Sequence, residues 1–157
     1  MLVVIILGSP SDLPLGEKIT GALDSFGVPS EMRVASAHKV PHYVLDMLAE
    51  YEADPRPKVY ITVAGRSNAL SGLVDAQVSR PVIACPPYAE KFAGSDLFSS
   101  LRMPSGVAPA VVLEPEAAAL LAAKMLSLAD PTLRQRIGAV QEAQRQRLLE
   151  ADASLRK

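Results

Sequence analysis

The sequence begins with an unbroken apolar run, Leu2–Leu7, and this run constrains the fold more than any other stretch. A run of this length, rich in β-branched residues, predicts a strand that is buried on both faces of a sheet. The polar turn Gly8-Ser9-Pro10-Ser11-Asp12 follows, and after it Leu15, Ile19 and Phe26 recur at helical spacing. A buried strand, a short polar turn and a helix form the first half of a βαβ unit, so we expect a parallel sheet.

The turn at residues 8–12, called the first turn below, has two interpretations. Ligands of open parallel sheets bind at the carboxyl ends of strands, and a following helix offers free N–H groups to an anion such as phosphate. Alternatively, Ser11 and Asp12 serve only as N-cap residues of the helix. This stretch alone leaves both interpretations open.

The alternation of strand and helix continues along the chain. Further strands are predicted to begin near Ser30, Val59 and Pro81, and a fifth covers Val111–Leu113. The segments between them have helical spacing, including a helix over 117–126. This order predicts a single three-layer α/β/α domain over residues 1–128, with a parallel, flavodoxin-like or Rossmann-like sheet.

Two more polar turns follow the next two strands. We call residues 36–39 the second turn and residues 65–68 the third turn. Because the carboxyl ends of parallel strands meet at the same edge of a sheet, the three turns are expected to share one site. None of them matches a Walker phosphate loop or a dinucleotide-binding fingerprint.

The last segment, residues 129–157, has a different pattern. Asp130-Pro131 is a typical helix start, with an N-cap residue before a proline. The helix that follows has only a narrow apolar stripe, formed by Ile137, Val140, Leu148, Ala151 and Leu155. We therefore predict an arm that packs on a neighbouring subunit, the alternative being a helix folded onto its own core.

Composition excludes several classes of function. The formal net charge is −1 and the basic residues are scattered, so neither a nucleic-acid groove nor a membrane-binding face is expected. No apolar run is long enough to span a bilayer, and the first one is too short for a signal peptide. The one cysteine excludes a disulfide framework. A cytoplasmic location is the default expectation.

The residues suited to chemistry are few. His38 and His42 have a spacing that could hold a metal on one helical face, but Lys39 lies between them, and we expect no metal. His38 lies in the second turn, where its imidazole suits general acid–base catalysis. His42 is expected to be an ordinary helix residue. Cys85 has no evident base partner and is expected to be a buried structural thiol.

The turns and the segments near them together resemble a known family, the 5-aminoimidazole ribonucleotide (AIR) carboxylases of purine biosynthesis, or PurE family. The resemblance covers the chain to about Leu128, and its pieces occur in the family's order. The matching stretches are Gly8-Ser9-Pro10-Ser11-Asp12-Leu13, Ser36-Ala37-His38-Lys39, Ala64-Gly65-Arg66-Ser67-Asn68, Pro81-Val82-Ile83 and Ser99-Ser100-Leu101-Arg102-Met103-Pro104-Ser105-Gly106-Val107.

The resemblance favours one of the family's two branches. Class I enzymes are mutases that move a carboxylate from the exocyclic nitrogen of N5-carboxy-AIR to ring carbon C4, and they carry a histidine where this chain has Ala69. Class I also has arginine at the position of Lys39. The sequence Ala64-Gly65-Arg66-Ser67-Asn68 is similar to class II, which uses CO2 itself without ATP, biotin or metal. No cofactor is therefore expected.

The resemblance also implies roles for individual residues. His38 corresponds to the catalytic histidine, and Asp12 to the residue that holds the ribose hydroxyls. Backbone N–H groups of the third turn, with Asn68 and Lys39, are expected to stabilise the new carboxylate. The phosphate-binding positions are Ser11, Ser36 and Lys39, and the full set expected to bind substrate is Ser9, Ser11, Asp12, Ser36, Ala37, Lys39, Ala64, Gly65, Arg66, Ser67, Asn68, Met103 and Ser105.

The expected activity is that of a carboxy-lyase which reversibly carboxylates AIR at C4 with CO2 to give CAIR, the C4-carboxylated product. The alternatives are the class I mutase and a non-catalytic, flavodoxin-like nucleotide-binding module, which would have no need of His38. The expected partners are AIR, CAIR and CO2. Membership of the family also implies a homo-oligomer, an octamer by preference and a tetramer otherwise.

Overall fold

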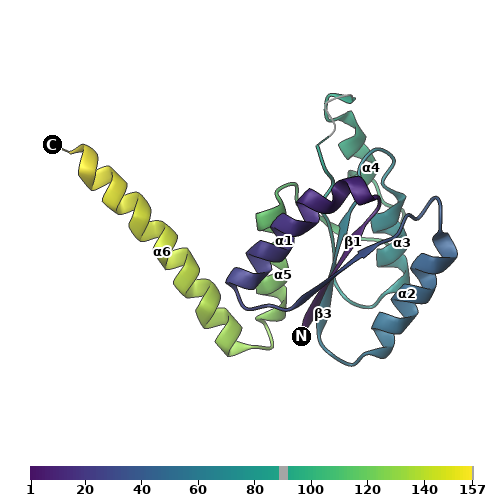
Figure 1. The fold of residues 1–157 in the computed structure, drawn as a ribbon, viewed down its shortest axis with the longest axis horizontal. Coiled ribbons are helices and arrows are strands. Elements are labelled where there is room, and N and C mark those ends of the chain that lie inside the picture. The colour runs from purple at the N-terminus through teal and green to yellow at the C-terminus, as the bar shows by residue number, and fades with distance from the viewer. Residues whose placement is uncertain (89–91, 157) are drawn as a thin grey trace.

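A computed structural model describes residues 1–88 and 92–156, and it has a five-stranded parallel sheet between two layers of helices (Figure 1). The strand order is β2-β1-β3-β4-β5, the arrangement of flavodoxin-like folds. The elements are β1 (Leu2–Leu7), η1 (Pro10–Asp12), α1 (Leu13–Ser25), β2 (Ser30–Val34), α2 (Pro41–Ala53), β3 (Lys58–Val63), α3 (Ala69–Gln77), β4 (Val82–Ala84), η3 (Ser95–Leu97), α4 (Phe98–Leu101), β5 (Ala110–Val111), α5 (Pro115–Leu126) and α6 (Pro131–Leu155).

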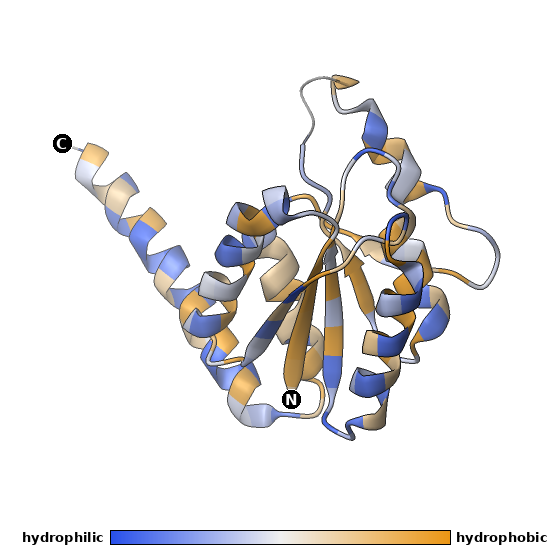
Figure 2. Cartoon of the chain, turned by 45° about the vertical axis from the view of Figure 1, so that its right-hand side comes forward, coloured by the Kyte–Doolittle hydropathy of each residue, from blue (hydrophilic) through white to orange (hydrophobic). Residues whose placement is uncertain are grey.

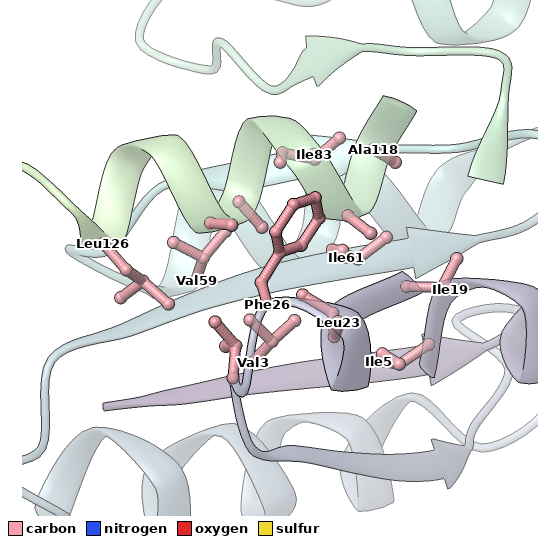
Figure 3. Packing of buried hydrophobic residues seen from close by; sticks show 14 of the residues in the cluster. Val3, Ile5, Ile19, Leu23, Phe26, Val59, Ile61, Ile83, Ala118 and Leu126 are labelled. Atoms are coloured by element: carbon pink, nitrogen blue, oxygen red, sulfur yellow. The ribbon is translucent and has the colours of Figure 1, made fainter. Parts of the chain in front are cut away.

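The central strand β1 explains why the sheet needs helices on both faces. Its residues are all buried and point alternately to opposite sides. Val3 and Ile5 pack against α1 and α5 (Figure 3), whereas Val4 and Ile6 pack against α2 and α3. In Figure 2 the inner strands are accordingly hydrophobic, while the helices are polar on their outer faces. The three-layer domain predicted from the sequence is therefore confirmed.

Helix α5 lies close to the sheet because its buried face is made largely of alanine. Ala118, Ala119, Ala122 and Ala123 are completely buried between β3 and α1. Small side chains allow a helix to approach, and the larger side chains of the opposite elements, such as Phe26 and Ile61, fill the remaining space (Figure 3).

Helix α5 begins two residues before the predicted helix over 117–126, and the fifth strand also differs from the prediction. It covers Ala110–Val111, not Val111–Leu113, and the Leu113 side chain is exposed. The reason lies in its neighbour β4, which ends at Ala84 and pairs only Ile83 with Ala110 and Ala84 with Val111. The two prolines that follow Cys85 cannot donate to a ladder and stop the pairing.

Helix α6 begins as predicted and then leaves the domain. The Asp130 carboxylate accepts hydrogen bonds from the backbone N–H groups of Thr132 and Leu133 at 2.9 and 3.0 Å. Leu133 and Ile137 are buried in the core, and the Arg136 side chain donates to the Phe26 carbonyl. Beyond these turns the helix projects into solvent (Figure 1), with Leu148 and Leu155 exposed at 71% and 83%. Its packing on a neighbouring subunit stays a prediction.

Within residues 1–88 and 92–156, the helices lack the combination of length and apolar character that crossing a membrane requires.

Candidate functional site

The three turns meet in one cavity at the carboxyl edge of the sheet. The cavity has a volume of about 510 Å³ and lies at the ends of β1, β2 and β3, away from the N-terminus in Figure 1. The predicted site residues that line it are Ser9, Ser11, Asp12, Ser36, Ala37, His38, Lys39, Ala64, Gly65, Arg66 and Ser67. The fold therefore places the three turns around one shared cavity.

In the first turn, the side chain that makes the capping hydrogen bond is that of Ser9, and not that of Ser11 or Asp12. The Ser9 hydroxyl accepts hydrogen bonds from the backbone N–H of Ser11 at 3.3 Å and from its hydroxyl at 2.9 Å, and so caps η1. Asp12 stands at the N-cap position of α1 but makes no side-chain capping bond. The interpretation that Asp12 only caps the helix is thus wrong, and its carboxylate is available to the cavity.

Burial and the neighbouring groups shift the pKa of Asp12 in opposite directions. Burial raises the pKa of Asp12 above its usual value, while the Ser9 backbone and the positive charge of Arg66 act in the opposite direction. A partly desolvated carboxylate gains more from a ligand's hydrogen-bond donors than one in water does. Asp12 is therefore suited to accept hydrogen bonds from hydroxyl groups.

The second turn contributes an imidazole and an ammonium group to the cavity, from two residues that are neighbours in sequence. Its shape is set by two backbone bonds, from Ala35 N–H to the Leu7 carbonyl and from Val40 N–H to the Ser36 carbonyl. His38 and Lys39 are exposed and line the cavity. The second turn therefore gives the cavity an imidazole that can transfer a proton and an ammonium group that can bind an anion.

The two histidines do not form the pair that their spacing suggested. Helix α2 begins at Pro41, so His38 lies in the turn before the helix, and His42 lies in its first turn and outside the cavity lining. Across the described residues, no three His, Cys, Asp or Glu side chains gather in a group that could hold a metal ion.

The third turn has a strained backbone that another segment supports. Arg66 has a φ of 57°, in the left-handed region that costs a residue with a side chain roughly 1–2 kcal/mol. Its N–H donates to Asp96 Oδ2 over 2.9 Å, and its carbonyl accepts from the Ser99 hydroxyl over 2.8 Å. The Arg66 N–H was expected to stabilise the new carboxylate, but it is already engaged.

Asn68 is turned away from the cavity. Its side chain is 5% exposed, accepts from the N–H of Ser71, and donates to the hydroxyls of Ser71 and Ser100 at 2.7 and 2.9 Å. All of its amide hydrogens and its oxygen have partners inside the protein. Asn68 therefore caps α3 and joins the third turn to α4, and does not line the cavity.

Two other predicted residues also lie outside the lining. The Met103 sulfur packs against α3, 3.2 Å from where a Cβ on Gly72 would stand. Ser105 is exposed in the loop that precedes β5. The structure thus brings together the predicted site residues of the three turns except Asn68, and it leaves Met103 and Ser105 outside the cavity lining.

Four lining residues were not predicted: Gly8, Ala69, Leu70 and Pro87. Gly8 allows the ends of β1 and β3 to approach, since a Cβ there would stand 3.1 Å from the Ala64 Cβ. Pro87 contacts the third turn, where a Cβ on Gly65 would meet it at 3.1 Å. Pro87 follows the fourth strand, so the rule that sites form at carboxyl ends of strands could have found it.

Cys85 is the buried, unreactive thiol that the sequence predicted. It is completely buried at the end of β4, and its sulfur donates weakly to the Leu113 carbonyl at 3.7 Å. Burial, with smaller contributions from Glu114 and Glu116, raises the pKa of Cys85 to about 12. A thiol held neutral is a poor nucleophile.

The cavity therefore combines cations, a carboxylate, hydroxyls and an imidazole. Lys39 and Arg66 supply positive charge for an anion, Ser11 and Ser36 supply hydroxyl groups, and Asp12 supplies an acceptor. Its volume is that of a small-molecule site. Such a lining can bind a phosphorylated, hydroxyl-bearing molecule beside a group that transfers protons.

Comparisons with known proteins agree with one another. A family model described as AIR carboxylase matches residues 2–147. A Treponema denticola protein named phosphoribosylaminoimidazole carboxylase is 51% identical over 99% of this chain and 98% of its own length. An Archaeoglobus fulgidus protein of the same name is 54% identical over 99% of this chain and 86% of its own.

A human protein and a solved structure extend these findings. The human protein is named bifunctional phosphoribosylaminoimidazole carboxylase/phosphoribosylaminoimidazole succinocarboxamide synthetase, and is 46% identical over 82% of this chain and 30% of its own length. A crystal structure described as Treponema denticola PurE superposes with a TM-score of 0.97, covering 99% of both chains at 51% identity.

Proposed function

The chain belongs to the AIR carboxylase family of purine biosynthesis, and from this membership we propose that it is a class II enzyme, which joins free CO2 to C4 of AIR without ATP. The observation that carries the proposal is the segment Ala64-Gly65-Arg66-Ser67-Asn68-Ala69, in which every residue except Asn68 lines the cavity. Where the mutase branch has an imidazole, this wall has only the methyl group of Ala69.

The substrate is proposed to bind across all three turns. Its 5′-phosphate pairs with Lys39 and receives hydrogen bonds from the Ser36 hydroxyl and from the Ser11 hydroxyl, which exchanges its bond to Ser9 for one to the phosphate. Its ribose hydroxyls donate to Asp12, whose partly buried carboxylate makes no capping bond. Lysine acts on phosphate as a point charge, whereas the arginine of the mutase branch is a bidentate donor.

The proposed chemistry needs no protein nucleophile. The aminoimidazole ring is an enamine, so its electron pair forms the bond from C4 to the carbon of CO2, and one C=O pair moves onto oxygen. The adduct carries a hydrogen on C4, and the His38 imidazole takes that proton to restore the aromatic ring. In the reverse direction His38 returns it. The inert Cys85 is consistent with this scheme.

The negative charge that develops on CO2 needs a donor or cation nearby. The Arg66 backbone N–H and the Asn68 amide are occupied by Asp96, Ser71 and Ser100. Since Lys39 pairs with the phosphate, we assign this role to the side chain of Arg66, which lines the cavity. Holding CO2 over C4 also removes an entropic barrier.

Assembly is part of the proposal. We propose a symmetric homo-oligomer, an octamer or otherwise a tetramer, in which the distal part of α6 packs on a neighbouring subunit. The exposed leucines of that part, Leu148 and Leu155, support this assignment, because an isolated helix gains nothing from exposing them.

The test is a bicarbonate titration without ATP. Purified protein is mixed with AIR, bicarbonate is varied, and formation of CAIR is followed. Saturable formation that depends on enzyme supports the class II proposal. AIR that binds without turnover would support a nucleotide-binding module, whereas turnover of N5-carboxy-AIR under a trap for free CO2 would support the mutase.

A further inference from the structure

The conformation of Arg66 in the third turn is supported by hydrogen bonds from another segment of the chain. Arg66 is in the left-handed region, and in the part of the chain that the structure describes its backbone N–H and C=O groups bond only to a segment about thirty residues later. Gly65 is partly buried against Pro87, whereas Arg66 and Ser67 are exposed. Core packing therefore gives Arg66 little support, although Ala64 and Asn68 on either side are buried.

Two side chains around α4 supply the missing support. Asp96 Oδ2 accepts the Arg66 N–H at 2.9 Å. The Ser99 hydroxyl lies 2.8 Å from the Arg66 carbonyl and 2.7 Å from the Asp96 carbonyl, and it accepts the Asn68 N–H at 3.0 Å. Its single proton serves one of the two carbonyls at a time. We call Asp96 and Ser99 the turn clamp.

We propose that the two residues of the turn clamp, Asp96 and Ser99, are positioning residues for carboxylation. They hold Arg66 in the left-handed conformation, and this conformation orients the third turn toward the CO2 that reacts. The inference rests on the proposed function, and it adds residues that do not line the cavity. The Asp96 carboxylate lies on the outer side of the turn, where it lines a second pocket that shares Pro87 with the first.

The turn clamp should affect the reaction more than binding of the nucleotide. The proposed contacts to phosphate and ribose come from the first and second turns, which make no bond to Asp96 or Ser99. A loosened third turn leaves those contacts in place but misplaces the groups that meet CO2. Loss of an interaction needed only in the transition state lowers kcat while KM for AIR stays similar.

The experiment compares variants of the full chain. Asp96→Ala removes the acceptor, and we expect kcat to fall about 10- to 100-fold, the cost of a misplaced reacting group, with KM for AIR changed less than about threefold. Asp96→Asn keeps an acceptor oxygen and should recover most of the loss. Ser99→Ala should show the same fall in kcat with a similar KM for AIR. If Asp96→Ala does not fold, Ser99→Ala tests the turn clamp in its place.

Asp54→Ala is the matched control. The Asp54 carboxylate also accepts a backbone N–H, that of Arg56 at 2.8 Å, but in the turn before β3 at the opposite edge of the sheet. Its loss should leave kcat within about twofold of the wild-type value, as expected of a surface contact remote from the site. Equal losses of kcat in Asp54→Ala and Asp96→Ala would overturn the proposal.

A second readout needs no substrate. Amide hydrogen exchange of the peptide containing residues 64–69 should become faster in Asp96→Ala and stay unchanged in Asp54→Ala. Unchanged exchange, or wild-type kcat in Asp96→Ala, would overturn the turn clamp. If the wild-type protein fails to carboxylate AIR, the proposed function falls, while the exchange result still decides whether Asp96 holds the turn.

Discussion

The Asn68 side-chain amide donates a hydrogen bond to the Ser100 hydroxyl over 2.9 Å and thereby ties the end of β3 to α4. Both side chains are buried, and the same amide group also donates to the Ser71 hydroxyl at 2.7 Å. Since buried polar groups are costly without partners, this bond network makes Asn68 a structural residue at the edge of the site.

Asn68→Ala should therefore destabilise the protein. The change removes the side-chain cap of α3 and leaves the hydroxyls of Ser71 and Ser100 short of partners, which costs about 1–3 kcal/mol. Denaturant unfolding measures the loss. Ser67→Ala at the exposed neighbouring position should change the free energy of unfolding by less than about 0.5 kcal/mol. Equal stability of the two variants would contradict the structural role.

His38→Asn should abolish turnover while AIR still binds. Losing a general acid–base group lowers kcat by about 100- to 10,000-fold, whereas the phosphate and ribose contacts remain. Steady-state kinetics and a binding titration check the two effects. His42 lies outside the cavity lining, so His42→Asn serves as the control and should be nearly silent. A comparable loss in both variants would argue against His38 as the acid–base residue.

Asp12→Asn and Ser36→Ala should weaken nucleotide binding more than they slow the reaction. The proposed contacts to the ribose and phosphate exist in the ground state and the transition state alike, so KM for AIR should rise more than kcat falls. Initial rates over a range of AIR concentrations separate the two parameters. An unchanged KM in both variants would move the nucleotide to another site.

The distal part of α6 should be an interface between subunits. Light scattering of the wild-type protein at micromolar concentration should show an oligomer, and Leu148→Glu with Leu155→Glu should reduce its mass, because charged groups would replace the exposed leucines. Ala153→Glu, on the opposite side of the helix, should leave the mass unchanged. A wild-type monomer would refute the prediction, whereas a tetramer would change only the expected number of subunits.

Local patterns were sufficient to predict most of the fold. The buried run of β1, the helical spacing of Leu15, Ile19 and Phe26 and the N-cap at Asp130 each depend on neighbouring residues, and the structure has the corresponding elements. The fifth strand begins one residue and ends two residues before the predicted positions, because its length depends on where β4 ends, which is a matter of pairing between strands.

The candidate site also has a part that local sequence patterns predict and a part that they do not. The first and second turns could be predicted because the strand and the turn are adjacent in sequence. The bonds of Arg66 to Asp96 and of Asn68 to Ser100 join residues about thirty positions apart, and no periodicity indicates such contacts. As a result, Asn68 was assigned to substrate, and the two residues of the turn clamp were missed.

The measurement that tests the central claim most directly traces the source of the carboxylate carbon. Unlabelled N5-carboxy-AIR is mixed with the enzyme and an excess of 13C-bicarbonate, and the first CAIR formed is analysed for label at the C4 carboxylate. A class II enzyme acts on the AIR that forms when N5-carboxy-AIR loses its carboxylate as CO2, and it joins free CO2 to that AIR, so we predict that the product carries 13C at the enrichment of the dissolved pool. Early product that contains only unlabelled carboxylate, transferred from the exocyclic nitrogen, would contradict direct use of CO2.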